Sequence, residues 1–159
     1  MKLKLEFDNI VDRPCCSVTV NQQQLYRGEV RPELTLFSKD LTDRVELKIT
    51  HYDKKPEETV VVDGKIVQDR SFTLEKIIVD NYSFDELIWE SKFYADTGEV
   101  YPSCLFFGPN GNFVIDFQLP VLPWILKTRH QKNNNDPNWE QDYNYYEQAC
   151  QLLSQISNK

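Results

Sequence analysis

The chain has 159 residues, with 25 acidic and 18 basic side chains and a formal net charge of −7. This length fits one domain with a full core, since 40% of the residues are hydrophobic. The acidic balance disfavours a nucleic-acid partner, because binding a phosphate backbone relies on clustered lysine and arginine. No stretch approaches the roughly 20 apolar residues of a membrane helix, and the alternating N-terminus MKLKLEFDNI shows no secretory signal. We therefore expect a protein made in the cytoplasm, without a membrane partner.

The cysteines favour a reduced compartment. They are Cys15, Cys16, Cys104 and Cys150. They form no CxxC pair and have no metal-ligand spacing with either histidine. Cys15 and Cys16 would point to opposite faces of a strand, so a bridge between them would be strained. We expect four reduced thiols that serve as small apolar residues.

Alternating apolar and polar residues predict four short strands before residue 38. One face of the first strand carries Leu3, Leu5 and Phe7. The expected strands lie within residues 2–7, 16–20, 25–30 and 34–37. Short strands at this spacing favour a sandwich or barrel over a fold in which strands alternate with helices.

The stretch from residue 44 to residue 88 is the centre of the predicted fold. It starts with a half-buried strand in which Val45, Leu47 and Ile49 share one face. A polar excursion follows, and its Asp63-Gly64 pair predicts a two-residue hairpin because both residues tolerate positive φ. Residues 72–79 become apolar on both faces, which predicts a central strand buried on both sides.

Beyond this centre we expect a second hairpin and then helices. Residues 101–107 and 113–119 are expected to pair across the turn at residues 108–111. After Pro120 the hydrophobic period changes to 3.6, which predicts a short apolar helix or turn and a longer helix over residues 137–157.

The predicted fold class is mainly β. It is an antiparallel, jelly-roll-like β-sandwich formed by residues 1–119, with a C-terminal α-helical segment, residues 120–159, packed on the same domain. The aromatic stripe of the longer helix would instead mark a partner surface, such as a homo-oligomer contact, if it were exposed.

The sequence contains none of the common catalytic motifs. It has no GxSxG, no HExxH, no phosphate-binding glycine loop and no EF-hand loop. His51 is in phase with the apolar residues of its strand, which favours a core or rim histidine over a general base. We therefore expect a non-catalytic protein. The alternative is a small cytoplasmic hydrolase, for which no nucleophile can be named.

Carboxylates gather in and around the polar excursion. They are Asp53, Glu57, Glu58, Asp63 and Asp69. Loops that join sandwich strands can present several oxygens to a hard cation such as calcium. The alternative is a solvated, charged loop in which Arg70 neutralises one carboxylate.

The segments NQQQLYRGEV, RVELKIT and QDRSFTLEKIIVDN resemble the calcium-dependent xylan-binding type of carbohydrate-binding module, over roughly residues 15–82. Asp69-Arg70-Ser71 matches the family's Asp-Arg-Asn motif. His51 and Tyr52 stand where the family has Asn-Asp, and Asp53 comes one place later. The resemblance implies a polysaccharide ligand and a calcium ion held by Asp53 and Asp69. The residues expected to contact carbohydrate or a partner are Tyr52, Asp53, Asp69 and Arg70.

The segment YPSCLFFGPNGNFVIDFQLPVLPWILKTR resembles small uncharacterised virion proteins of tailed cyanobacterial phages. This implies a protein made in the host cytoplasm and built into the particle. Our leading hypothesis is a non-catalytic structural or attachment component of the virion, in the tail, baseplate or capsid surface. It would contact other virion proteins and cell-surface polysaccharide. The alternative is a calcium-dependent polysaccharide-binding module that acts on its own.

Overall fold

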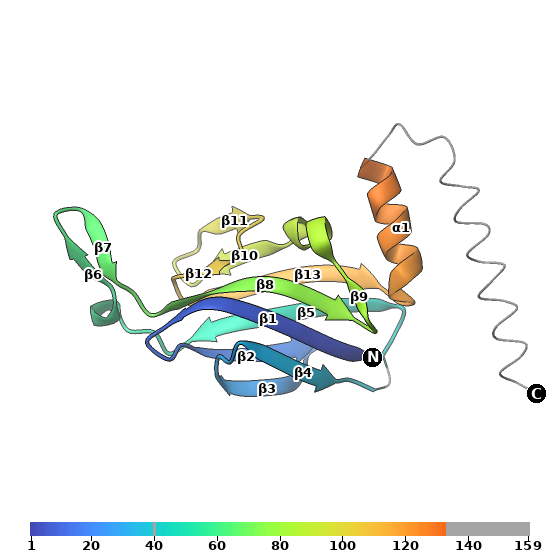
Figure 1. Ribbon diagram of the computed structural model, residues 1–159, viewed down its shortest axis with the longest axis horizontal. Helices are drawn as coiled ribbons and strands as arrows, with labels where there is room; N and C mark the ends of the chain where they lie inside the picture. Colours follow the sequence, from blue (N-terminus) through green and yellow to red (C-terminus); the bar gives the residue numbers. More distant parts are fainter. Residues whose placement is uncertain (40, 133–159) are drawn as a thin grey trace, which may run out of the picture.

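The protein is an antiparallel β-sandwich, seen in a computed structural model that describes residues 1–39 and 41–132 (Figure 1). One sheet contains β1 (Lys2–Val11), β4 (Glu33–Phe37), β8 (Ser71–Val79), β9 (Tyr82–Ser83) and β12 (Phe106–Phe107). The other contains β2 (Cys15–Val20), β3 (Gln23–Glu29), β5 (Arg44–Tyr52), β10 (Lys92–Ala95), β11 (Val100–Pro102) and β13 (Gly111–Gln118). The remaining elements are strands β6 (Val60–Val62) and β7 (Lys65–Gln68), the 3-10 turns η1 (Pro56–Glu58) and η2 (Asp85–Glu90), and helix α1 (Val121–Lys132). The predicted fold class is confirmed.

The core lies between the two sheets, and an aromatic cluster joins them. Phe72 of β8 stacks on Phe107 at a centroid distance of 4.3 Å and meets Phe7 edge-on at 5.6 Å. Phe107 also meets Phe93 of the second sheet at 5.3 Å. Phe72, Phe93 and Phe107 are fully buried, and each buried ring contributes about 1.5–3 kcal/mol to folding. The alternation predicted for β5 is present as well, because its inward face is buried throughout.

The predicted hairpin between residues 101–107 and 113–119 is wrong. Phe106–Phe107 instead pairs with β8 in the first sheet, whereas β13 pairs with β10 and β5 in the second. Burial of the Phe107 ring against Phe72 outweighs local pairing, because a core aromatic removes a large apolar area from water. Residues 108–110 therefore cross from one sheet to the other.

Strand β8 is not buried on both faces, so that prediction is also wrong. Its register with β1 shifts between Leu74, which pairs with Phe7, and Lys76, which pairs with Glu6. The extra residue, Glu75, forms a bulge that moves the buried face from one alternation to the other. Phe72 and Leu74 before the bulge and Ile77 and Val79 after it therefore reach the same core.

The predicted Asp63-Gly64 hairpin is confirmed. Asp63 has φ of 50° and Gly64 has φ of 74°, as a primed turn requires. The turn joins β6 to β7, and this two-stranded ribbon projects from one end of the sandwich (Figure 1). Every residue of the two strands is exposed.

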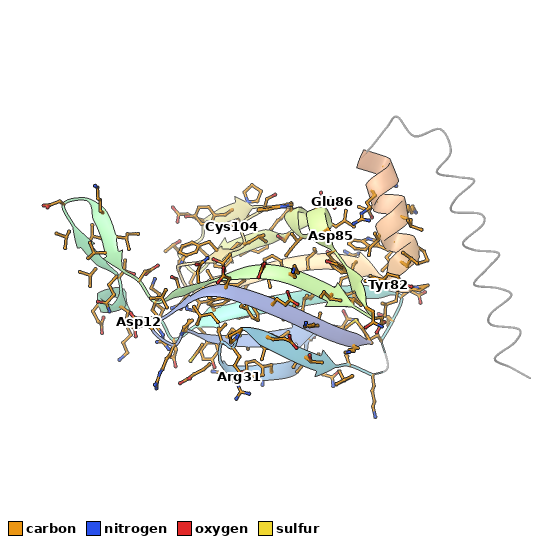
Figure 2. All side chains as sticks on the ribbon, in the orientation of Figure 1. Asp12, Arg31, Tyr82, Asp85, Glu86 and Cys104 are labelled. Carbon is orange, nitrogen blue, oxygen red and sulfur yellow. The ribbon has the colours of Figure 1, made fainter. Side chains whose placement is uncertain are left out.

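Helix α1 covers the opposite end of the molecule. Its Val121 and Ile125 are buried in the common core. Its Arg129 forms ion pairs with Asp85 (2.9 Å) and Glu86 (2.7 Å) of η2. These two carboxylates are labelled in Figure 2. The longer helix predicted over residues 137–157 lies outside the described residues. No helix within the described part of the chain is long and apolar enough to cross a membrane.

The described cysteines are free thiols, as expected: Cys15, Cys16 and Cys104. Cys16 points into the core, and burial raises its pKa to about 12. Cys15 lies on the outward face of the same strand. Cys150 lies outside the described residues.

Candidate functional site

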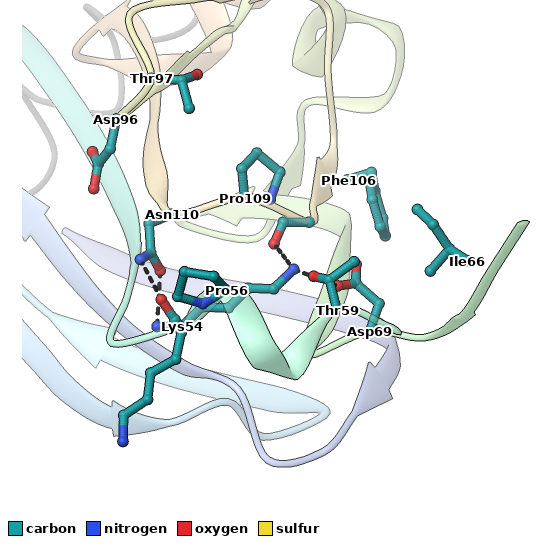
Figure 3. Close-up of a pocket in the computed structure, with 12 residues that line it drawn as sticks. Lys54, Pro56, Thr59, Ile66, Asp69, Asp96, Thr97, Phe106, Pro109 and Asn110 are labelled. Carbon is teal, nitrogen blue, oxygen red and sulfur yellow. Dashed lines mark hydrogen bonds and ion pairs between the residues drawn. The ribbon is translucent and has the colours of Figure 1, made fainter. Parts of the chain in front are cut away.

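A groove with a volume of about 530 Å³ lies beside the β6–β7 ribbon, whose Ile66 forms part of its lining. Four segments of the chain contribute to it: the loop after β5, strand β7 with the residues that follow it, the β10–β11 turn, and β12 with the crossover that follows it (Figure 3). Its lining residues lie within 54–59, 66–69, 96–97 and 106–110. The groove is therefore assembled by the fold and not by one continuous segment.

The apolar part of the groove centres on Phe106. Its side chain is 48% exposed, and Ile66 of the ribbon, which is 64% exposed, borders the same side of the pocket (Figure 3). The Phe106 ring can occupy this position because residue 108 is glycine. A Cβ atom at Gly108 would lie 2.5 Å from Cε1 of Phe106, a separation that real Cβ atoms essentially never show. Glycine at position 108 thus lets the Phe106 ring lie against the main chain while it lines the groove.

Polar groups border the other side of the groove. The Asn110 side chain donates to the carbonyl of Lys54 (2.9 Å) and accepts from the Lys54 backbone N–H (3.0 Å). The backbone N–H of Asp96 donates to the carbonyl of Asn110 (3.0 Å). These bonds fix three of the contributing segments relative to one another, so this part of the groove is preorganised.

A largely buried ion pair lies in the groove wall. Lys54 Nζ donates to Oδ1 of Asp69 and to the carbonyl of Gly108, the latter at 2.6 Å. Thr59 Oγ1 donates to the same Asp69 oxygen at 2.7 Å. The two charged side chains are only 9% and 13% exposed. The Asp69 carboxylate is therefore neutralised by groups of the protein itself.

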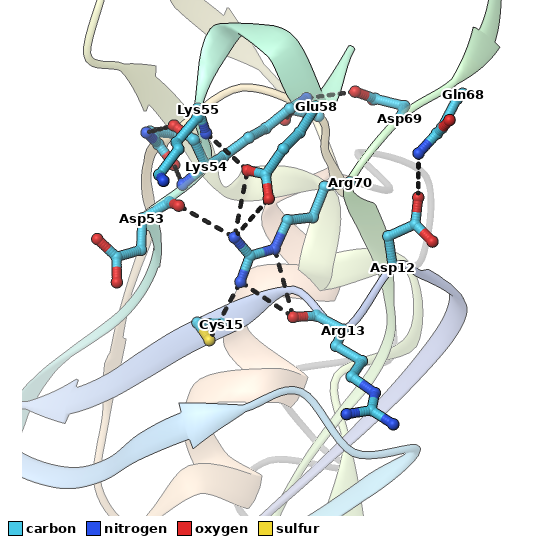
Figure 4. Close-up of polar contacts among 12 residues, drawn as sticks. Asp12, Arg13, Cys15, Asp53, Lys54, Lys55, Glu58, Gln68, Asp69 and Arg70 are labelled. Carbon is cyan, nitrogen blue, oxygen red and sulfur yellow. Dashed lines mark hydrogen bonds and ion pairs between the residues drawn. The ribbon is translucent and has the colours of Figure 1, made fainter. Parts of the chain in front are cut away.

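Arg70 holds the loops beside the groove together (Figure 4). Its guanidinium donates to the carbonyls of Arg13 and Asp53 at 3.0–3.3 Å, to both carboxylate oxygens of Glu58 at 3.1 and 3.2 Å, and to Cys15 Sγ at 3.4 Å. The pKa of Glu58 is lowered, first by the backbone N–H of Lys55 and then by Arg70. Arg70 thus neutralises one carboxylate, as the charged-loop alternative proposed, but its side chain is only 15% exposed and not solvated.

The structure separates the four residues predicted to bind a ligand. Asp69 lines the groove, whereas Arg70 directs its donors to protein acceptors beside it. Tyr52 lies on the outward face of β5, with the Arg27 guanidinium 4.3 Å from its ring centroid. Asp53 contributes its backbone carbonyl, and its carboxylate is turned away from Arg70 (Figure 4). Direct contacts of these residues with a ligand remain predictions.

The predicted calcium ion fits this arrangement poorly. Asp69 is already paired with Lys54, and the Asp53 carboxylate is turned away from the ion-pair network. Among residues 1–39 and 41–132, no group of three or more His, Cys, Asp and Glu side chains could hold a metal ion.

Three residues that line the groove were not predicted as site residues. The sequence pattern predicts a local hairpin for Phe106, Gly108 and Asn110. The adjacent phenylalanines of LFFG were the available signal, since two successive strand residues point to opposite faces and one ring must leave the core.

No protein-family model matches the sequence, and no curated protein sequence matches it. Among solved structures, the chain is similar to one described as vCBM60 in complex with galactobiose, with a TM-score of 0.48 and 11% identity. The match covers 72% of this chain and 96% of that one. A likeness at this level concerns the arrangement of strands and says nothing about the groove residues. The resemblance to virion proteins remains a prediction.

Proposed function

We propose that this chain is a non-catalytic carbohydrate-binding module that holds a short segment of polysaccharide in the groove. The observation that carries the proposal is the exposed Phe106 ring beside fixed hydrogen-bonding groups in an open cleft. A sugar ring presents an apolar C–H face and a rim of hydroxyls. It is therefore complementary to an aromatic face flanked by amide, hydroxyl and carboxylate groups.

The state of the carboxylates supports binding without hydrolysis. Glycoside hydrolysis usually needs two carboxyl groups on either side of the scissile bond, one acting as acid and the other as base or nucleophile. Of the two aspartates that line the groove, Asp69 is held by Lys54 and Thr59, while Asp96 is exposed to solvent. Asp69 is therefore engaged within the protein through two donors to its Oδ1.

A role in a virion remains a second prediction with its own test. The groove would serve a free module and an attachment protein of a particle equally well. Mass spectrometry of purified particles would detect the chain if it were a virion component, and its absence there would remove this hypothesis.

The proposed function is tested by a glycan array followed by calorimetry on the best oligosaccharide. We expect binding to weaken at least about tenfold in Phe106→Ala, equivalent to about 1.4 kcal/mol, because the stacking surface is removed. Phe37→Ala is the matched control. Phe37 is 68% exposed and lies at the end of β4, away from the residues that line the groove. Failure to bind any glycan, or equal affinity in the two variants, would contradict the proposal.

A further inference from the structure

We infer that the Lys54 ammonium is a built-in cation of this site, so that the groove forms and binds its ligand without a metal ion. The inference rests on the proposed function only for its ligand-binding readout. Nζ of Lys54 is held by a carboxylate oxygen of Asp69 and by the carbonyl oxygen of Gly108. Carboxylate and main-chain carbonyl oxygens are the ligand types that calcium takes in proteins. In this protein the ammonium of Lys54, a cation tethered to the chain, already contacts both oxygens.

Burial makes this arrangement stable against exchange with a dissolved ion. A lysine whose side chain is only 9% exposed needs a compensating charge, and Asp69, whose side chain is 13% exposed, supplies it. The main chain of Lys54 is fixed by two hydrogen bonds with the Asn110 side chain. The Lys54 side chain therefore extends from a backbone position that is held in place. A calcium ion would have to expel this side chain and leave its charge without a partner.

The surrounding charges also oppose an added divalent ion. Lys54 pairs with Asp69, and the neighbouring Arg70 pairs with Glu58, so two cations already balance two anions. Calcium requires six to eight oxygens. Asp69 and Gly108 present far fewer, and both contact Lys54. To take Asp69 or Glu58 as a ligand, an added divalent ion would have to break one of these two ion pairs.

The tether connects the cation to the binding surface. By holding the carbonyl of Gly108, Lys54 fixes the residue on which the Phe106 ring rests. The loop after β5 and the crossover after β12 are 54 positions apart in sequence and are joined at this point. Lys54 is therefore a positioning residue for the aromatic platform, in the structural role that a bound ion would otherwise fill.

Melting temperatures with and without calcium test the inference directly. The melting temperature of the unchanged protein should be the same in millimolar calcium and in excess chelator. Lys54→Met should melt about 5–10 °C lower, because Asp69 is left buried without its partner. Lys55→Met is the matched control, since it removes an exposed charge from the same groove and should change the melting temperature little. The double variant Lys54→Met/Asp69→Leu should recover part of the loss, because it removes both buried charges.

Glycan affinity provides the second readout. It should be unchanged by chelator and should fall in Lys54→Met but not in Lys92→Met, which removes an exposed charge from β10 outside the groove lining. A calcium-induced rise in the melting temperature of the unchanged protein, or a Lys54→Met variant as stable as Lys55→Met, would overturn the inference. Loss of glycan binding on chelation would overturn it as well. If no glycan bound at all, the proposed function would fail, while the melting experiments would still decide whether Lys54 replaces a metal.

Discussion

The groove and the core directly beneath it are held together by different interactions. In the core, Phe72 stacks on Phe107 and meets Phe7 and His51 edge-on, so many weak contacts act together. In the groove, a few directional bonds from Lys54 and Arg70 fix the loops. Changes in the core should therefore lower stability, whereas changes at the groove surface should alter binding in a protein that still folds.

The largest effect on stability is expected from Phe72→Ala. The ring is fully buried and touches aromatic rings from both sheets, so truncation leaves a cavity where the sheets are joined. We expect the free energy of unfolding to fall by about 3–5 kcal/mol in urea denaturation. Phe37→Ala, which removes a 68% exposed ring, should stay within about 0.5 kcal/mol of the unchanged protein. Similar losses in the two variants would show that the aromatic cluster is not what stabilises the sandwich.

An intermediate effect is expected from the protonation of His51, which lies between the core and the groove. Burial lowers the pKa of His51 below its ordinary value of 6.5, although its bond with the Pro109 carbonyl opposes the shift. The unfolded chain therefore binds this proton more tightly than the folded protein. The His51 contribution to stability is complete above pH 6.5 and is lost as the pH falls towards the lower folded pKa.

Urea denaturation between about pH 7.5 and pH 5 measures this contribution. Carboxylates with a lowered pKa do not interfere in this range. The stability that Glu58 contributes, for example, is lost only as the pH falls near and below its ordinary pKa of 4.5. In His51→Leu the dependence of stability on pH should flatten over the same range. An unchanged slope in this variant would mean that another group titrates there.

The smallest effect on stability is expected from Gly108→Ala. The new Cβ would force the Phe106 ring away from its position, but a half-exposed ring can turn towards solvent at little cost. We expect a stability change below about 1 kcal/mol and severalfold weaker glycan binding by calorimetry. Gly28→Ala on β3 is the control, since its Cβ would meet only the end of the Tyr26 side chain, whose hydroxyl would lie at 3.2 Å. Equal glycan affinity in Gly108→Ala and the unchanged protein would show that the ring position does not matter.

The parts of the fold that depend on local sequence were predictable. The alternation from Val45 to Ile49 and the Asp63-Gly64 turn both reflect neighbours within a few residues, and both are present in the structure. The pairing of Phe107 with Phe72 was not predictable, because the packing of a core ring depends on a strand far away in the chain. The bulge at Glu75 was missed for the same reason, since it exists only in the register between β8 and β1.

The site was less predictable than the fold. Asp69 was identified from a motif and does line the groove. Its partner Lys54, in a polar loop, has the sequence context of any solvated lysine, and nothing local indicates that it is buried. Phe106 and Gly108 reach the site only because the crossover after β12 connects two sheets. A binding site assembled from long-range contacts therefore requires the three-dimensional structure.

The most direct test of the central claim is a nuclear magnetic resonance titration of the protein with the oligosaccharide that binds best on the array. The claim predicts that the perturbed backbone amides cluster in residues 54–59, 96–97 and 106–110, with saturation at the calorimetric affinity. Perturbations confined to the outward face of the six-stranded sheet, at residues such as Thr50 and Tyr94, with unchanged groove amides, would contradict it.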